Sequence, residues 1–195
     1  MFKKLLRQLD PQFFWPYWVS KIHWKYFLPG KIAELKRMGC VIGDRFTMLD
    51  GVDIDYNHCW LVSIGNDVTL APGVKILAHD ASMYPYLGYA RIGKVTLGNR
   101  VFIGANSIVL PGVSIGDEAI VGAGSVVSRD IPARSIAAGN PAKVLCGLDE
   151  FLARRKKEIA EGPYFDESYT TPRNVSASGK REMVDRLGSG FGYVK

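Results

Sequence analysis

Three histidines are the side chains best suited to proton transfer in this chain: His23, His58 and His79. An imidazole changes charge near neutral pH, so it can gain or lose a proton under physiological conditions. His79 ends the largely apolar segment 74–78 and is followed by a long segment, 80–91, that contains three tyrosines. A histidine in a loop is more often structural than catalytic, but loops on a rigid scaffold commonly carry function. We therefore take His79 as the main candidate for catalysis.

The three cysteines, Cys40, Cys59 and Cys146, lie far apart and form no Cys-x-x-Cys pair. This spacing predicts neither a disulfide framework nor a structural zinc site, and it suits a reducing compartment. We expect no metal requirement.

The elements that must position these residues follow a six-residue rhythm, in which short apolar triplets alternate with turn residues. A fixed hexapeptide period predicts a parallel β-helix, with three strands to each triangular coil and the outer two residues of each triplet facing inward. Gly, Asn, Asp and Pro between the triplets provide the turns. The triplets in register are 46–48, 52–54, 62–64, 68–70, 74–76, 101–103, 107–109, 113–115, 119–121, 125–127 and 131–133.

Two interruptions of the rhythm and two flanking segments divide the chain. Residues 39–147 form the repeat, which is interrupted at 56–61 and by the loop 80–91. Residues 1–38 are rich in aromatic and basic side chains, and 31–38 has the apolar spacing of a short helix. We expect 1–38 to cap the open end of the β-helix, with contact to a membrane surface as the alternative. Residues 148–195 predict a charged helix at 149–161, followed by a polar, Gly-rich tail.

Outward residues eighteen apart should stack in columns on the sides of the β-helix. The expected columns are Phe102 with Ile120 and Ala138, Ile108 with Val126, and Ser114 with Pro132. The outward residues of the N-terminal coils are polar, whereas two of these later columns are apolar. Contiguous apolar surface usually marks a contact, so we predict a closed oligomer that buries one of these columns. The alternative is that the helix at 149–161 covers a column within the same chain.

The formal net charge of +6 favours an anionic partner, such as a nucleotide cofactor, a membrane surface or an acidic glycan. We expect no nucleic-acid partner. No apolar run approaches the roughly 18 residues of a membrane span, and the segment 2–9 is too short and too charged for a secretory signal. We therefore expect a cytoplasmic protein, with peripheral membrane contact through the N-terminal segment as a further alternative.

Four strings of residues resemble one known family. The strings 103–113 (IGANSIVLPGV), 115–117 (IGD), 121–127 (VGAGSVV) and 138–144 (AGNPAKV) resemble the hexapeptide-repeat acyltransferases, closest to their maltose, galactoside and polysaccharide O-acetyltransferases. The resemblance covers about residues 40–147. It implies an all-β fold, a left-handed parallel β-helix, although strand crossovers are otherwise right-handed. It also implies a homotrimer with active sites between subunits and acetyl-CoA as the donor.

The same resemblance assigns roles to individual residues. His79 matches the family's catalytic histidine, which as a general base would be worth about 10²–10⁴-fold in rate. The residues matching the family's contacts to coenzyme A are Ala105, Ala123, Ser128, Arg129 and Lys143. Arg129 and Lys143 could pair with phosphate groups. Cys146 stands where the family has a further basic residue, so the phosphate clamp departs from the family pattern.

The acceptor side is less well defined by the sequence. Family contacts to the acceptor come from the coil before the histidine, and we assign Asp55 and Asn57 to sugar hydroxyls and Tyr84 to stacking on a sugar ring. Asp80 or a backbone carbonyl would orient His79. The predicted function is acetyl-CoA-dependent O-acetylation of a sugar or glycan hydroxyl.

Several alternatives stay open beside this prediction. The acceptor could be the amine of an amino sugar or a xenobiotic, or the chain could be a non-catalytic module for assembly or membrane docking. We set aside a zinc enzyme resembling the γ-class carbonic anhydrases, because that site would need three histidines and the repeat holds only His58 and His79. Covalent catalysis by Cys59 lacks an evident base partner.

Overall fold

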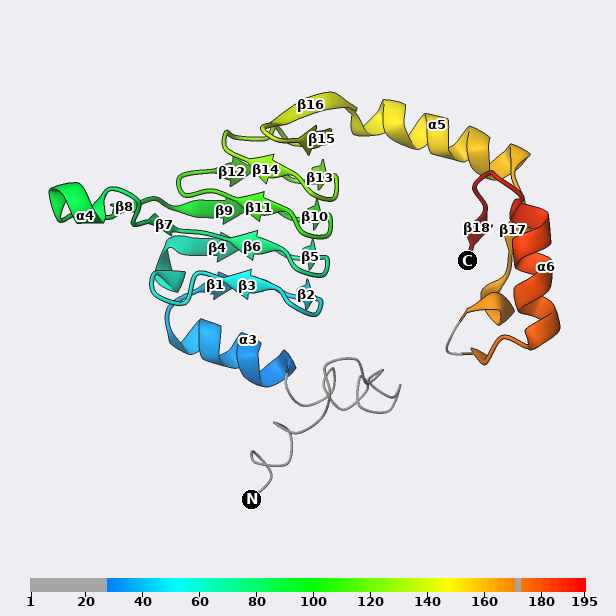
Figure 1. The fold of residues 1–195 in the computed structure, drawn as a ribbon, viewed down its shortest axis with the longest axis horizontal. Coiled ribbons are helices and arrows are strands. Elements are labelled where there is room, and N and C mark those ends of the chain that lie inside the picture. The colour runs from blue at the N-terminus through cyan, green and yellow to red at the C-terminus, as the bar shows by residue number, and fades with distance from the viewer. Residues whose placement is uncertain (1–27, 171–172) are drawn as a thin grey trace, which may run out of the picture.

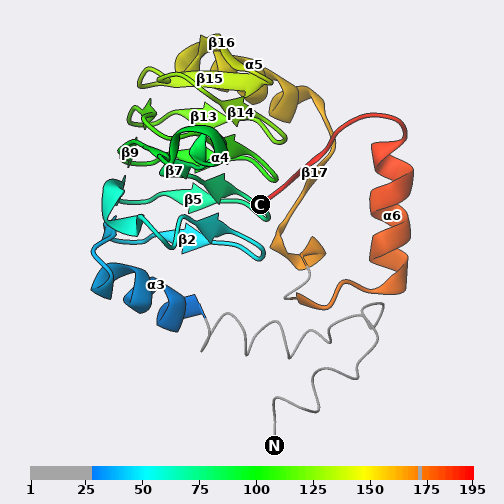
Figure 2. The same cartoon turned by 60° about the vertical axis from the view of Figure 1, so that its left-hand side comes forward.

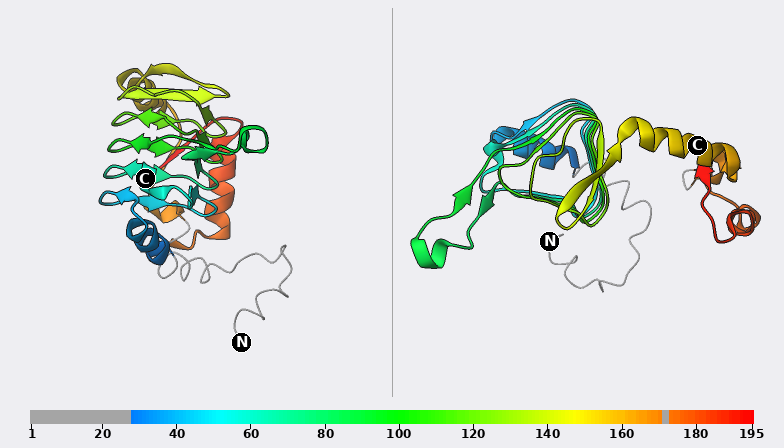
Figure 3. Two further views of the ribbon diagram at one scale, coloured as in Figure 1. Left: turned by 90° about the vertical axis from the view of Figure 1, so that its left-hand side faces the viewer. Right: turned by 90° about the horizontal axis from the view of Figure 1, so that it is seen from above.

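The hexapeptide rhythm forms short parallel strands in the computed structural model, which describes residues 28–170 and 173–195. The strands stack into three sheets, and these sheets are the sides of a triangular coil, seen from above in Figure 3. Each strand pairs with the strands of the coils before and after it, so backbone groups find partners along the stack. The stack runs upward in Figure 1 from α3 to β16.

The chain visits the three sheets in turn. The first sheet holds β1 (Val41–Ile42), β4 (Val62–Ile64), β9 (Val95–Leu97) and β12 (Ser114–Ile115). The second sheet holds β2 (Thr47–Met48), β5 (Thr69–Leu70), β10 (Phe102–Ile103), β13 (Ile120–Val121), β15 (Ser135–Gly139) and β16 (Ala142–Gly147). The third sheet holds β3 (Asp53–Ile54), β6 (Lys75–Ile76), β11 (Ile108–Val109) and β14 (Val126–Val127).

The predicted inward residues form the core. Almost every outer residue of the triplets is buried, in one continuous cluster of Ile, Val, Leu, Met and Ala side chains. Burying each such aliphatic side chain contributes about 1.5–3 kcal/mol relative to leaving it exposed. Two inward positions are serines, Ser107 and Ser125, and both hydroxyls donate to the carbonyl of Gly122. These buried polar groups are therefore satisfied.

The outward columns agree with the sequence prediction up to residue 127. Phe102 pairs with Ile120, and Ile108 with Val126, whereas the earlier coils present Thr69 and Lys75 at the same places. The predicted change from polar to apolar outer surface is therefore confirmed.

The predicted columns are wrong in the last coil, where the spacing falls from eighteen residues to sixteen. Ile136, not Ala138, pairs with Ile120, and Ile131 pairs with Ile115. Asp130 rather than Pro132 consequently lies beside Ser114 and accepts a hydrogen bond from its backbone N–H.

The turns between the sheets form three corners. We call the turns 43–46, 65–67, 98–100, 116–118 and 132–134, between the first and second sheets, the ladder corner. The turn corner, between the second and third sheets, comprises 49–51, 71–73, 104–106 and 122–124. The site corner, between the third and first sheets, comprises 55–61, 77–94, 110–112 and 128–130. Both interruptions of the rhythm lie at the site corner, and its longest insertion projects outward, as Figure 3 shows.

An additional element lies beyond each end of the stack. At one end α3 (Leu28–Arg37) lies where the sequence predicted a helix, with Leu35 buried in the core and Ile32 and Met38 packed against it. At the other end β16 folds back antiparallel on β15 and leads into α5 (Leu148–Glu161). Most of the segment expected to act as a cap or to touch a membrane precedes residue 28 and lies outside the described residues.

The C-terminal segment leaves the stack along α5 (Figure 2). It contains α6 (Ala177–Leu187), a short 3-10 turn (Glu167–Tyr169) and the parallel pair β17 (Tyr164–Phe165) and β18 (Tyr193–Val194), although the sequence predicted no regular structure there. Phe165 is buried within this unit, and Tyr193 donates to Glu158 of α5. Phe102 is 43% exposed, so α5 leaves this member of the column uncovered. Among the described residues, no helix has the length and apolar character to cross a membrane.

Candidate active site

The site corner brings Asp55 and His79 together from adjacent coils. Asp55 follows β3, and His79 follows β6, which pairs with β3 in the third sheet. The backbone N–H of Asp55 donates to Ile76, and the N–H of buried Ala78 donates back to the Asp55 carboxylate at 2.8 Å. This reciprocal bonding fixes the carboxylate beneath the strand end that carries His79.

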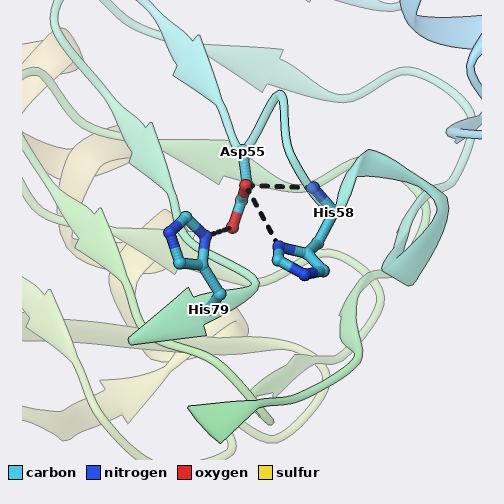
Figure 4. A group of neighbouring side chains, drawn as sticks. All are labelled: Asp55, His58 and His79. Carbon is cyan, nitrogen blue, oxygen red and sulfur yellow. Dashed lines mark hydrogen bonds and ion pairs between the residues drawn. The ribbon is translucent and has the colours of Figure 1, made fainter. Parts of the chain in front are cut away.

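The imidazole of His79 meets this carboxylate directly. Nδ1 of His79 lies 2.5 Å from Oδ2 of Asp55, whose side chain is only 1% exposed (Figure 4). The other carboxylate oxygen accepts from the backbone N–H groups of Asn57 and His58. An ionised carboxylate can only accept hydrogen bonds, so the proton lies on Nδ1 and the Nε2 lone pair of His79 is free.

The charge on Asp55 is stabilised despite its burial. Burial raises the pKa of the carboxyl, but hydrogen bonds from His79 and from the backbone N–H groups of Ala78 and His58 outweigh this effect and hold the pKa below its ordinary value. Asp55 therefore stays ionised and keeps His79 in one tautomer and one orientation.

A second histidine lies against this pair. The ring of His58 is 5.0 Å from the ring of His79 and 5.4 Å from that of Trp60, centroid to centroid. Nδ1 of His58 faces Oδ1 of Asp55 at 4.0 Å, which is too long for a hydrogen bond. The sequence pointed to His79 alone as the catalytic histidine and did not place His58 beside it. The proximity of His58 follows from the 3-10 turn Cys59–Leu61, which the triplet pattern did not reveal.

The structure corrects two expectations at this corner. Asp55, assigned to sugar hydroxyls, is buried, and its carboxylate is engaged by four donors, so it orients His79 instead. Asp80, which the sequence offered beside a backbone carbonyl as the group that orients His79, accepts from the N–H of Ser82. Chain proximity suggested Asp80, but a strand end points neighbouring side chains in opposite directions.

The two remaining acceptor candidates are exposed. Asn57 lies on the surface beside Asp55. Tyr84 is 60% exposed and begins α4 (Tyr84–Leu87), the tip of the projecting loop. The base of this loop is the antiparallel pair β7 (His79–Asp80) and β8 (Arg91–Ile92), so the loop is anchored at His79 itself.

The residues assigned to coenzyme A divide between two corners and the top of the stack. Ala105 and Ala123 occupy stacked turns of the turn corner, where the N–H of Gly124 donates to Ala105. Ser128 and Arg129 are exposed at the site corner after β14, two coils above His79, or about 10 Å at the usual strand spacing. Lys143 is exposed on β16. One chain therefore does not place Ala105 and Ala123 at the corner that carries His79.

The buried thiols have no evident part in this chemistry. Cys59 is fully buried, and burial raises the pKa of Cys40 to about 12, so its thiol stays protonated.

Comparison with known proteins identifies the family. The model described as "Hexapeptide repeat of succinyl-transferase" matches residues 94–129. Protein CapG of Staphylococcus aureus is 38% identical over 124 residues, which cover 60% of this chain and 72% of CapG. The chain therefore belongs to the hexapeptide-repeat acyltransferase family, whose fold is the left-handed parallel β-helix.

Two further relatives are named for their reactions. Galactoside O-acetyltransferase of Escherichia coli K12 is 36% identical over 101 residues, which cover 47% of this chain and 46% of the enzyme. A solved structure of a galactoside acetyltransferase in complex with coenzyme A is 25% identical, with a TM-score of 0.50 over 65% of this chain and 74% of that one. The chain spans about half the length of the first curated relatives that it matches.

Proposed function

We propose that this protein is an acetyl-CoA-dependent O-acetyltransferase that acts on a sugar or glycan hydroxyl. The observation that carries the proposal is the pairing of His79 with a buried, ionised Asp55 at the base of the one long loop of the described β-helix. Such a pair is built to accept a proton at Nε2 of the imidazole. Two relatives are named as galactoside acetyltransferases, and this supports acetyl transfer as the reaction in which His79 would act as the base.

The proposed reaction begins with proton transfer to His79. The acceptor hydroxyl loses its proton to Nε2 as its oxygen attacks the thioester carbonyl, and the nearby Asp55 carboxylate stabilises the imidazolium that forms. The tetrahedral oxyanion requires a hydrogen-bond donor, for which we assign a backbone N–H of an adjacent turn. Collapse of this intermediate gives the acetyl ester, and the proton leaves with the coenzyme A thiol.

We propose that acetyl-CoA binds between two subunits of a trimer. A neighbouring chain could bring its Ala105 and Ala123 turns against the corner that carries His79. Ser128, Arg129 and Lys143 are exposed, so they are free to contact the donor, with Arg129 and Lys143 facing its phosphates. Asn57 and Tyr84, also exposed, would contact the acceptor. The exposed apolar side chain of Phe102, next to Ile120, supplies a surface for the subunit contact.

The test is to incubate the protein with acetyl-CoA and a panel of sugars, nucleotide sugars and glycans, and to measure release of free coenzyme A. We expect at least one acceptor to accelerate release, and His79→Ala to lower the rate by about 10²–10⁴-fold without changing the mass of the assembly. The control is Asp80→Asn, which alters the neighbouring carboxylate that bonds Ser82 and should leave the rate near that of the wild type. Equal turnover by His79→Ala would remove the general-base role, and no acceleration by any member of the panel would contradict a sugar acceptor.

A further inference from the structure

His58 has a hydrogen-bonding atom that its surroundings do not satisfy. Within residues 28–170 and 173–195, Nδ1 of His58 is the one buried side-chain nitrogen or oxygen without a hydrogen-bond partner. Leaving such an atom unpaired usually costs about 1–3 kcal/mol, so an unpaired atom in a native fold requires an explanation. The ring is 28% exposed, but the unpaired nitrogen is its inner atom, directed at Asp55.

The unpaired nitrogen belongs to a compact group of three potential ligands. One atom each from Asp55, His58 and His79 lie within 4.8 Å of one another. Both imidazoles present Nδ1 to the same carboxylate, His58 to Oδ1 and His79 to Oδ2 (Figure 4). The His79 nitrogen is satisfied by the carboxylate alone, whereas the His58 nitrogen is too far from it.

We propose that Asp55, His58 and His79 form a binding site for a divalent transition-metal cation of the zinc type. Two imidazoles and one carboxylate suit Zn²⁺ and its neighbours in the first transition row, whereas Mg²⁺ and Ca²⁺ prefer oxygen ligands. Three protein ligands also leave a coordination position for water. The carboxylate supplies negative charge, and the cation would satisfy the His58 nitrogen.

The bound arrangement requires only small movements of the three side chains. Zinc bonds of about 2.0–2.1 Å place neighbouring ligands of a tetrahedral site about 3.3 Å apart. The 4.0 Å separation of His58 Nδ1 from Asp55 must therefore shorten, and the 2.5 Å separation of His79 Nδ1 from Asp55 must lengthen. The His58 and His79 side chains are partly exposed, so we expect rotation of their rings to supply both changes without movement of the buried backbone.

Metal binding and base catalysis exclude each other at His79, a consequence that rests on the proposed function. A nitrogen binds a metal through its lone pair, so the proton now on Nδ1 must move to Nε2 or leave to solvent. In the neutral, metal-bound ring, Nε2 carries the proton and cannot accept another from a substrate hydroxyl. The metal would also take Asp55 from its role in orienting the ring. The site would therefore act as an inhibitory switch.

The binding test is calorimetric titration of the chelator-treated full-length protein with Zn²⁺. We expect one saturable site per chain, and His58→Ala and His58→Gln should each weaken binding by at least about tenfold. His23→Ala, which alters the third histidine of the sequence, and Cys146→Ser, which removes a partly exposed thiol, should bind as the wild type does. Circular dichroism checks that each variant is folded. Absence of binding by the wild type, or unchanged affinity in both His58 variants, would overturn the proposal.

A second measurement separates this inference from the proposed function. Free coenzyme A release is measured with and without Zn²⁺, and inhibition is expressed as a ratio within each variant. The wild type should be inhibited at the Zn²⁺ concentrations that saturate the calorimetric site, and the His58 variants should require at least about tenfold more. Zinc binding by a protein that transfers no acetyl group would sustain the metal site and reject the transferase. Acetyl transfer that saturating Zn²⁺ leaves untouched would reject the switch.

Discussion

The ladder corner and the site corner both carry polar side chains that accept hydrogen bonds from backbone N–H groups, but they use these side chains in opposite ways. At the ladder corner the side chains repeat from coil to coil. Asn66 accepts from the N–H of Asp44, Asn99 from that of Asn66, and Asp117 from that of Asn99. At the site corner Asp55, His58 and His79 occur once each, and their hydrogen bonds converge on one carboxylate.

Ion pairs extend the same contrast. Arg100 and Arg134 both pair with Glu118, and Arg45 pairs with Asp67, so exposed charges also link successive coils at the ladder corner. Polar groups that recur with the repeat hold it together, whereas polar groups that occur once, at an interruption, are available for chemistry.

The sharpest test of this contrast is the same substitution at both corners. Asp55→Asn should lower the rate of acetyl transfer by about 10²–10⁴-fold, because an amide cannot accept from His79, Ala78, Asn57 and His58 together and the imidazole loses its tautomer. Asp117→Asn keeps an oxygen for the Asn99 N–H and should leave the rate unchanged. The measurement is coenzyme A release by protein shown to be folded. Equal losses in the two variants would mean that the corners do not differ in function.

The outer faces of the first and second sheets should contribute differently to subunit assembly. Phe102→Asp places a charge in the apolar column beside Ile120 and should convert the proposed trimer to monomers or to insoluble protein. Thr96→Asp adds the same charge to an exposed position of the first sheet and should leave the assembly intact. Light scattering of each purified variant measures the mass. A Phe102→Asp protein with the wild-type mass would show that this column is not the subunit contact.

Because the coils stack closely at the ladder corner, a single added methyl group there should destabilise the fold. A Cβ on Gly65 would lie 2.6 Å from the carbonyl oxygen of Gly98 and 2.9 Å from the Asn99 nitrogen, so Gly65→Ala should destabilise the fold by about 1–3 kcal/mol. Gly30 lies in α3 with open space around it, and Gly30→Ala should stabilise by about 0.5–1 kcal/mol. Urea unfolding midpoints compare the two. A Gly65→Ala protein of wild-type stability would mean that adjacent coils separate without cost.

The smallest expected effect is the pH dependence of the ladder corner. Hydrogen bonds from Arg45, from the Asn99 backbone and from Arg100 lower the pKa values of Asp67, Asp117 and Glu118, respectively. Their stabilisation is complete above the ordinary values of 3.8 for Asp and 4.5 for Glu, and it is lost as the pH falls through the lowered folded values.

The melting temperature should therefore be flat near neutral pH and should decline in acid. Asp67→Asn should make that decline less steep, and added salt should reduce it, because these charges are exposed. A decline of the same slope in Asp67→Asn would show that the ladder charges contribute nothing.

Periodicity was sufficient to predict the core. A triplet such as 101–103 needs only its register to place Val101 and Ile103 inside and Phe102 outside, because strand side chains alternate. The same extrapolation failed after residue 127, where the Asp130 side chain takes the place of a backbone partner and shortens the coil by two residues. The hexapeptide period of the earlier coils does not predict the length of the last coil.

The sequence predicted the position of the candidate site, but it did not predict which side chains contact His79 there. The larger interruption located His79, whereas the role of Asp55 depends on stacking across 24 residues of sequence. The predicted sugar contact at Asp55 failed because a surface turn and a buried turn look alike in sequence. The sequence placed His58 in the smaller interruption but could not place it beside His79, since only the three-dimensional turn directs its Nδ1 inward.

The reversed strand at the top of the stack has a consequence beyond this single chain. A parallel β-helix is open at each end, and identical open ends could in principle join copy to copy into a fibre, as exposed sheet edges do in amyloid. Here β16 runs antiparallel on β15 and continues directly into α5, while α3 buries Leu35 beneath the first coil. At the β16 end of the second sheet, a second copy therefore meets an edge strand that runs opposite to the strands beneath it, so it cannot continue the sheet there in parallel.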